Sequence, residues 1–330
     1  MLKAAVIGIG AMGKNHARIY SDLDGVKLVA LCDSSAEHAS FLAGKYGCKY
    51  YADYKEMLSK EKIDLVSIAV PTSSHKAVAL DCIAKKINCL IEKPIAPTLK
   101  EAEQIIRAAR ASKVKLTVGH VERFNPAIIE LKKRLDNNEV GRVFKIDANR
   151  VGPFPSRIRD VGVVIDLATH DIDIMRYLTG SEVARLFAET EQKIHTSNED
   201  LLSGILKFKN NAICNFNINW LTPTKIRKLY VTGEKGMFVV NYLHQDLYFY
   251  ENEEIHNNLE YADLMRGVSE GKMSKFFINK KEPLKAELEH FADCVANDKK
   301  PLVSGEDGLK ALEIALKLIE SANTNKVIML

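Results

Sequence analysis

The chain lacks several features that would place it outside the ordinary globular enzymes. No apolar stretch approaches the ~20 residues that a membrane-spanning helix needs, and no run of five like charges suggests a nucleic-acid arm or a polybasic membrane segment. None of the 6 cysteines forms a CxxC pair, which predicts reduced, buried thiols. No charged n-region or apolar h-region precedes an expected strand at Leu2. These absences predict a soluble, cytoplasmic protein without nucleic-acid or membrane partners.

The 330 residues are enough for two domains, and the pattern changes along the chain. Up to Gly119, short apolar strands alternate with amphipathic helices, as in a parallel sheet covered on both faces. After Asn125–Pro126, strand-like runs follow one another without crossover helices, which predicts a mostly antiparallel sheet. The stretch Glu251–Phe276 is polar and is predicted to be irregular. We therefore predict an α/β protein with one boundary after residue 122.

A glycine-rich motif follows the first expected strand and opens a helix. It consists of Gly8, Ile9, Gly10, Ala11, Met12 and Gly13. The first glycine permits a tight turn, the second lets the backbone approach a pyrophosphate, and the third lets helix and strand pack closely. The pyrophosphate would lie on the N–H groups at the helix start. The motif predicts an N-terminal Rossmann domain over residues 1–122 that binds a dinucleotide.

Asp33 lies twenty residues after Gly13, at the end of the next expected strand. Its carboxylate is expected to accept hydrogen bonds from the adenine ribose and to repel a 2′-phosphate, which predicts NAD rather than NADP. Ser34 and Ser35 follow, where an NADP enzyme usually has an arginine. The alternative role for Asp33 is that of a helix N-cap.

Two further segments carry candidate catalytic residues. Glu92-Lys93-Pro94 ends the fourth expected strand, at the sheet edge where such folds bind ligands. On an expected helix, Asp166, His170, Asp173 and Tyr177 form one polar stripe between apolar rows, which indicates a partly buried polar site. A neutral histidine there could serve as general base for a hydroxyl. The alternatives are a surface Glu–Lys pair, a structural histidine, or a metal site, for which no third ligand is evident.

These signals, in this order, resemble the glucose–fructose oxidoreductase / inositol dehydrogenase (Gfo/Idh/MocA) family over essentially the whole chain. The resemblance implies a C-terminal α+β domain, residues 123–330, with an open, mostly antiparallel sheet used for oligomer contacts. It implies that Lys93 binds the reacting hydroxyl, that His170 is the general acid/base, and that Asp166 positions the substrate or the histidine. It also implies cofactor contacts from Pro71, Thr72, His75, Glu92 and Lys93. One departure is Val121, where many members carry an asparagine that contacts the nicotinamide.

Within the family, residues 149–162 and the stretch Glu122–Pro126 look most like the branch that oxidises UDP-activated N-acetylamino sugars. Arg150, Arg157 and Arg159 make the loop before the His170 helix basic, which suits a diphosphate. The alternative is a solvated basic loop.

The combined reading is an NAD-dependent sugar dehydrogenase. The expected reaction is hydride transfer from a ring carbon, C3 of a UDP-N-acetylglucosamine-type sugar, with Lys93 and His170 as the acid-base pair and no metal. The alternatives are a dehydrogenase of a free sugar or inositol, and a non-catalytic NAD-sensing regulator. A homodimer or homotetramer is expected to form through the open sheet, whose apolar residues Ile213, Phe216 and Ile218 would need cover.

Overall fold

The architecture is that of a computed structural model, which describes residues 1–155, 161–194, 197–253 and 270–330. The chain divides into two compact units. The first comprises Met1–Val121 and Glu282–Glu313, and the second comprises Glu122–Lys281 and Ile314–Leu330. The predicted division had a single boundary after residue 122, so the grouping of residues 282–313 with the first unit differs from it.

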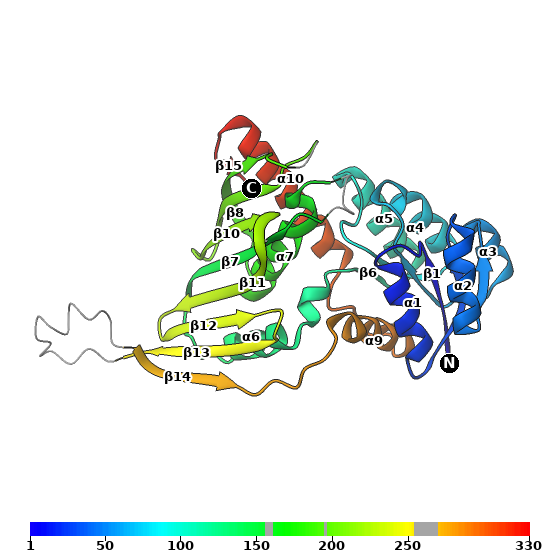
Figure 1. Cartoon of the computed structure of the whole chain (residues 1–330), viewed down its shortest axis with the longest axis horizontal. Helices are drawn as coiled ribbons and strands as arrows, with labels where there is room; N and C mark the ends of the chain where they lie inside the picture. Colours follow the sequence, from blue (N-terminus) through cyan, green and yellow to red (C-terminus); the bar gives the residue numbers. More distant parts are fainter. Residues whose placement is uncertain (156–160, 195–196, 254–269) are drawn as a thin grey trace, which may run out of the picture. The chain divides into compact units, whose positions relative to one another are not determined.

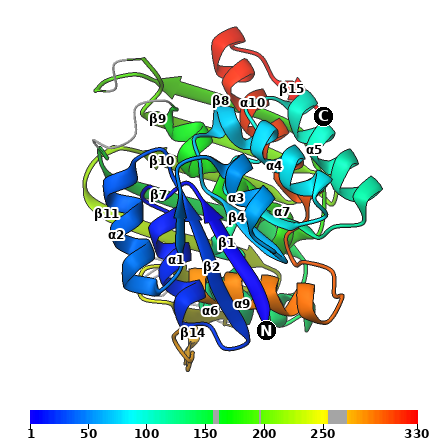
Figure 2. The same ribbon diagram turned by 90° about the vertical axis from the view of Figure 1, so that its right-hand side faces the viewer.

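The first unit is built on a six-stranded sheet in which every pairing of neighbouring strands is parallel. The strand order is β3-β2-β1-β4-β5-β6, so the direction of winding reverses between β1 and β4. This order defines the doubly wound dinucleotide-binding fold and confirms the predicted Rossmann domain. Figure 2 shows β1, β2 and β4 side by side. The strands are β1 (Leu2–Ile7), β2 (Val26–Cys32), β3 (Lys49–Tyr51), β4 (Leu65–Ile68), β5 (Asn88–Ile91) and β6 (Leu116–Val118).

Helices with well-defined ends connect these strands. At the start of α5, Thr98 Oγ1 accepts the Glu101 N–H and donates to the Glu101 carboxylate, so Thr98 is the N-cap of this helix. The segment between β2 and β4 contains α2, β3 and α3, which the sequence analysis did not predict. The helices are α1 (Gly13–Asp22), α2 (Ala36–Tyr46), α3 (Tyr54–Lys60), the short 3-10 turn η1 (Thr72–Ser74), α4 (His75–Ala84), α5 (Leu99–Ser112), α9 (Pro283–Ala296) and the first part of α10 (Gly305–Thr324).

Helix α9 lies late in the sequence but packs on the start of the chain. Its residues Leu284, Leu288 and Phe291 are buried in the same apolar cluster as residues of β1, β2 and α1. In Figures 1 and 2, α9 lies beside α1. Burial of this apolar face is the physical reason that α9 belongs to the first unit.

The second unit contains a nine-stranded sheet in the order β14-β13-β12-β11-β7-β10-β9-β8-β15. All neighbouring strands are antiparallel except β7 and β10, which are parallel. The predicted open, mostly antiparallel sheet is therefore confirmed. Its strands are β7 (Val143–Pro153), β8 (Val183–Glu191), β9 (Leu201–Phe208), β10 (Ile213–Asn219), β11 (Leu221–Gly233), β12 (Gly236–Asn241), β13 (Asp246–Asn252), β14 (Glu270–Phe276) and β15 (Ile328–Met329).

The strands of this sheet have one buried and one more exposed face. On β10, Phe216 and Ile218 are 3% and 0% exposed, whereas Ile213 is 41% exposed. The prediction that these three residues share an open face is therefore wrong, because side chains alternate along a strand and Ile213 has the opposite parity. Ile205 on β9, at 50% exposure, lies on the more exposed face with Ile213.

Helices pack against the buried face of the sheet. Asn125 caps α6 by accepting the Ala127 N–H, and Pro126 occupies the first helical position. The prediction that Glu251–Phe276 is irregular is wrong at the C-terminal end of this stretch, because β14 pairs with β13 there. The helices are the 3-10 turn η2 (Val121–Phe124), α6 (Pro126–Asp136), the π-helical turn η3 (Val164–Ala168), α7 (Thr169–Thr179) and the last part of α10.

Candidate active site

The glycine loop lies at the carboxyl end of β1, next to the point where the winding of the sheet reverses. Gly8 has a φ of 88°, and a Cβ on it would lie 2.6 Å from the carbonyl atoms of Ala69. A Cβ on Gly13 would lie 1.7 Å from the Gly8 carbonyl oxygen. Both glycines are therefore required by the protein itself.

Gly10 is different, because it is exposed and a Cβ on it would meet nothing within 4 Å. Its φ is not in the left-handed region, so the backbone does not demand a glycine there. The fold leaves bare backbone facing open space at the start of α1, which fits the approach of a dinucleotide pyrophosphate. Among the predicted loop contacts, Ile9 is buried, whereas Ala11 and Met12 are exposed beside Gly10.

Asp33 is positioned by the same loop. Its Oδ2 accepts the Ile9 N–H at 2.6 Å, and its Oδ1 accepts the Ser35 N–H at 2.8 Å. Each carboxylate oxygen keeps a lone pair for a further donor. The bond to Ile9 ties Asp33 to the glycine loop and so places both parts of the predicted nucleotide site together.

Glu92 of the Glu-Lys-Pro segment belongs to a buried hydrogen-bond network. His16 Nε2 lies 2.9 Å from Glu92 Oε1, and His16 Nδ1 lies 2.9 Å from Ser67 Oγ. The Tyr20 hydroxyl lies 3.0 Å from the same Ser67 oxygen. Burial alone would raise the pKa of Glu92, but the hydrogen bond with His16 and the charges of His16 and Lys93 hold it below its usual value. The network links helix α1, which follows the glycine loop, to the residue that precedes Lys93.

Lys93 is partly buried at the end of β5, and its bond to Pro94 is cis. His75 lies beneath this turn, with Nδ1 2.9 Å from the Pro94 carbonyl oxygen and Nε2 2.9 Å from the Val70 carbonyl oxygen. Because His75 is only 1% exposed, it supports the turn and has no surface for the predicted cofactor contact. Pro71 is exposed at the end of the β4 segment, at the same edge of the sheet. Thr72 is half-buried there.

In the second unit, Asp166 and His170 lie where the helix changes its type. The π-helical turn Val164–Ala168 continues directly as α7, and such turns are frequent at functional sites. Both side chains are partly exposed, whereas Asp171 and Asp173 are each 1% exposed. The helix thus presents Asp166 and His170 outward and directs two other acids into the core.

Arg150 is one of the buried partners of this helix. Its Nε donates to Asp171 Oδ2 at 2.6 Å, and its Nη1 donates to Glu122 Oε1 at 2.9 Å. Its guanidinium lies over the ring of Tyr242, and the residue is 3% exposed. Its charge is engaged by two carboxylates inside the unit, and only its Nη2 has no hydrogen-bond partner among the described residues, so the phosphate contact of Arg150 stays a prediction.

Arg123 forms the second buried pair. Its Nε and Nη2 donate to the two oxygens of Asp173 at 2.7 and 2.6 Å, and its guanidinium lies 4.9 Å from the ring centre of Tyr177. Two members of the predicted polar stripe, Asp173 and Tyr177, therefore hold α7 in place. Glu122 and Arg123, predicted only as part of a branch signature, are the residues that anchor it.

The remaining predicted substrate contacts, Arg157 and Arg159, lie outside the described residues. Among the described residues, no group of three or more His, Cys, Asp or Glu side chains is arranged to hold a metal ion. Nor is any helix in the described ranges long and apolar enough to cross a bilayer. All 6 cysteines are unpaired, and 5 of them are buried as predicted, whereas Cys48 is half-buried.

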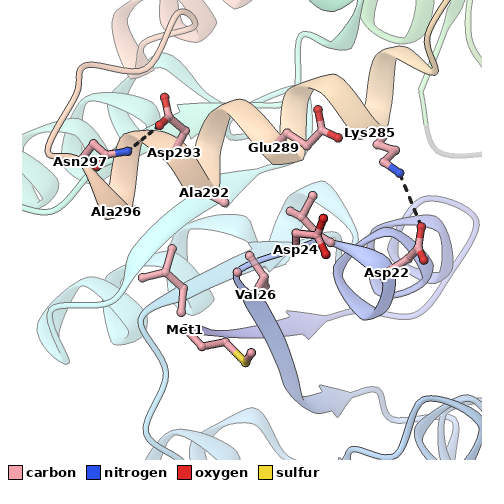
Figure 3. A pocket seen from close by; sticks show the side chains of 13 residues that line it. Met1, Asp22, Asp24, Val26, Lys285, Glu289, Ala292, Asp293, Ala296 and Asn297 are labelled. Carbon is pink, nitrogen blue, oxygen red and sulfur yellow. Dashed lines mark hydrogen bonds and ion pairs between the residues drawn. The ribbon is translucent and has the colours of Figure 1, made fainter.

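A surface pocket of about 580 Å³ lies elsewhere in the first unit, as Figure 3 shows. Met1, Leu2, Gly25 and Val26 line it, so it lies at the amino ends of β1 and β2. Ligands of open parallel sheets bind at the carboxyl ends of the strands, where the glycine loop lies. The pocket is therefore not part of the candidate nucleotide site.

Comparison with known proteins agrees with this geometry. Residues 2–120 match the model described as "Oxidoreductase family, NAD-binding Rossmann fold", and residues 132–330 match "Oxidoreductase family, C-terminal alpha/beta domain". The fold and the site thus define an NAD-binding oxidoreductase. More specifically, the chain belongs to the Gfo/Idh/MocA oxidoreductase family.

Relatives resemble the chain along nearly its full length. UDP-N-acetylglucosamine 3-dehydrogenase of Acidithiobacillus ferrooxidans is 27% identical over 317 residues, which is 96% of each chain. Its solved structure has a TM-score of 0.87 at 26% identity and covers 98% of both chains. The NAD-dependent scyllo-inositol 2-dehydrogenase of Bacillus subtilis is 28% identical over 334 residues, covering 97% of this chain and 94% of its own. Homologues of this kind make the chain an oxidoreductase, while their substrates differ.

Several residues around the site were not predicted. They include His16, Ser67, Asp171, Arg227 and Tyr242. The helical spacing of His16 from the glycine motif was visible in the sequence, but its partners come from β4 and β5 and only the folded sheet brings them together.

Proposed function

We propose that this protein oxidises a ring hydroxyl of a sugar with NAD, at C3 of a UDP-N-acetylglucosamine-type nucleotide sugar. The observation that carries the proposal is the full-length likeness to a UDP-N-acetylglucosamine 3-dehydrogenase, at a TM-score of 0.87. The presence of Lys93, Asp166 and His170 at the motif positions supports it, because a sensor without turnover needs none of them.

NAD is proposed as the preferred cofactor because of Asp33. The Gly10 backbone and the start of α1 would hold the pyrophosphate, and Asp33 would accept the ribose hydroxyls. A 2′-phosphate would be placed against the Asp33 carboxylate. We expect a preference of at least roughly tenfold for NAD, which Asp33→Ala should narrow.

In the proposed mechanism, NAD supplies the acceptor for the hydride that leaves the ring carbon. His170 takes the proton of the reacting hydroxyl. Lys93 stabilises the negative charge that develops on the oxygen, and Asp166 accepts hydrogen bonds that orient the sugar. Asp171 and Asp173 form buried ion pairs that hold the helix in place. The side chains of Asp166 and His170 on this helix therefore keep their direction.

Arg157 and Arg159 are proposed to bind the diphosphate of the nucleotide sugar. Guanidinium groups pair with phosphate oxygens through two parallel hydrogen bonds, and a free sugar offers no such group. Loss of either arginine should raise the Michaelis constant for a UDP-sugar by roughly tenfold, with a smaller change in turnover. We do not include Arg150 in this set, since Asp171 and Glu122 already engage it.

A second candidate substrate is an inositol or a free sugar. It is favoured by the relationship to scyllo-inositol 2-dehydrogenase. That enzyme is 28% identical to this chain, and the nucleotide-sugar enzyme is 27% identical. The same acid-base residues would serve this reaction.

We further propose that the protein forms a homodimer or homotetramer through the more exposed face of the nine-stranded sheet.

The test is a comparison of substrates and variants by NADH formation. UDP-N-acetylglucosamine should be turned over faster than free N-acetylglucosamine or inositol. Lys93→Ala and His170→Ala should each lose at least ~100-fold in turnover while NAD binding survives. The exposed residues Lys100 and His244, changed to alanine, are controls that should keep native rates. A faster reaction with unphosphorylated compounds would refute the nucleotide-sugar assignment.

A further inference from the structure

Arg227 lies in the middle of the nine-stranded sheet, directly opposite Arg150. The two residues pair in the antiparallel ladder between β11 and β7. Side chains of directly opposed residues point to the same face of a sheet, with Cβ atoms about 4.5–5.5 Å apart. Arg227 therefore lies on the face against which α7 packs, where Arg150 meets Asp171.

Arg123, Arg150 and Arg227 differ in their hydrogen-bond partners. Arg123 donates two hydrogen bonds to Asp173, and Arg150 donates to Asp171 and Glu122. Arg227 is half-buried, has no carboxylate partner within the described part of the chain, and its Nη1 is buried there without a hydrogen-bond partner. Arg150 Nη2 also lacks a partner, but the guanidinium of Arg150 still has two carboxylates. A buried charged donor without an acceptor is costly, so an acceptor from outside the protein would stabilise Arg227 in this position.

The electrostatic surroundings point the same way. Burial and the neighbouring charge of Arg150 lower the pKa of Arg227 to about 10, although Asp171, Glu122 and Asp166 act in the opposite direction. The carboxylates of Asp171 and Glu122 are bonded to Arg150, and neither forms a hydrogen bond with Arg227 in the described part of the chain. The turn that carries Asp166 continues directly as α7, whose Asp171 is the partner of Arg150.

The backbone beside Arg227 is irregular. The register with β7 shifts between Leu221 and Ile226, so the strand bulges just before Arg227. Asn219 holds the start of this bulge, because its Oδ1 accepts the N–H groups of Leu221 and Thr222. Bulges beside active sites commonly re-aim a side chain, and this one sits one residue from Arg227.

We propose that Arg227 binds an oxyanion of the substrate, a carboxylate or a phosphoryl group, on the sheet face where Arg150 meets α7. Its guanidinium donates two parallel hydrogen bonds to two oxygens of the anion, as Arg123 does to Asp173. The assignment rests on the proposed sugar-oxidising function and, within it, favours sugars that carry an anionic group over the inositols and free sugars of the second candidate. Arg227 is then a specificity-determining residue.

The test measures anion binding separately from turnover. Calorimetry of the full-length protein with saturating NADH uses UDP as the phosphoryl probe, D-glucuronate as the carboxylate probe and D-glucose as the neutral control. Arg227→Gln should weaken the binding of one anion by at least ~10-fold, and Arg227→Lys should weaken it less, because charge remains but the fork is lost. Lys228→Gln removes the next positive charge along the strand, on the opposite face, and should leave the affinity for both anions unchanged.

The anion whose affinity falls identifies the chemical source of the oxyanion. Native-like binding of both anions by Arg227→Gln, or binding of neither anion by the unchanged protein, overturns the assignment. A drop in melting temperature of Arg227→Gln with unchanged anion affinity also overturns it, since that is the behaviour of a structural arginine. Failure of the unchanged protein to oxidise any sugar would refute the proposed function, while the calorimetric comparison would still decide the role of Arg227.

Discussion

The glycine loop allows cofactor binding and folding to be separated by two similar substitutions. In Gly13→Ala, the added methyl would lie 1.7 Å from the Gly8 carbonyl oxygen. Since C···O contacts are normally about 3.3 Å or longer, the backbone of the loop would have to move by about 1.6 Å. In Gly10→Ala, the methyl would meet nothing within 4 Å, and the backbone conformation accepts alanine.

The expected magnitudes follow from these contacts. Overpacking against backbone should destabilise Gly13→Ala by about 3 kcal/mol, which lowers the melting temperature by roughly 6–10 °C. Gly10→Ala should leave the stability unchanged or raise it by about 0.4–1 kcal/mol, because the unfolded chain loses freedom. The same methyl should weaken NADH binding by at least ~10-fold, because it occupies the space through which the pyrophosphate approaches the backbone.

The assays are thermal unfolding by circular dichroism and titration of NADH by fluorescence. Gly44→Ala is a matched control, because Gly44 also meets nothing within 4 Å and lies away from the loop on α2. Native-like NADH affinity in Gly10→Ala would refute the assignment of this glycine to the cofactor. Equal losses of stability in Gly10→Ala and Gly13→Ala would refute the steric argument.

Three further predictions concern stability and assembly. Asp173→Asn should lower the free energy of unfolding by about 3–5 kcal/mol, because Arg123 stays buried with an incomplete partner. The control Glu56→Gln, at an exposed position, should lower it by less than about 1 kcal/mol. Equal urea midpoints for the two variants would contradict this prediction. The pKa of Glu92 in the folded protein lies below its unfolded value of about 4.5. Ionised Glu92 therefore contributes fully to the free energy of unfolding above that pH, and this contribution is lost as the pH falls further. Glu92→Gln should flatten the dependence of the unfolding free energy on pH below about 4.5. A matching slope in both proteins would show that Glu92 is not responsible. Light scattering should find a mass above that of one 36.9 kDa chain at micromolar concentration, and a monomer would rule out the proposed assembly.

The sequence by itself was sufficient for features that depend on local spacing. The glycine motif with Asp33 identified the dinucleotide-binding half, since each residue has a separate steric or electrostatic task within one strand-turn-helix unit. The change from alternating helices and strands to consecutive strands predicted both sheets.

The tertiary structure decided which polar residues are buried partners and which remain available. Arg150 lies in a basic segment of the sequence, yet the fold encloses it between Asp171 and Glu122, which lie 21 and 28 residues away along the chain. The burial of His75 under Pro94 and the pairing of Arg227 opposite Arg150 depend in the same way on contacts between distant segments. Spacing along one helix or strand fixes direction, but charge compensation in a core is set by neighbours that only packing brings together.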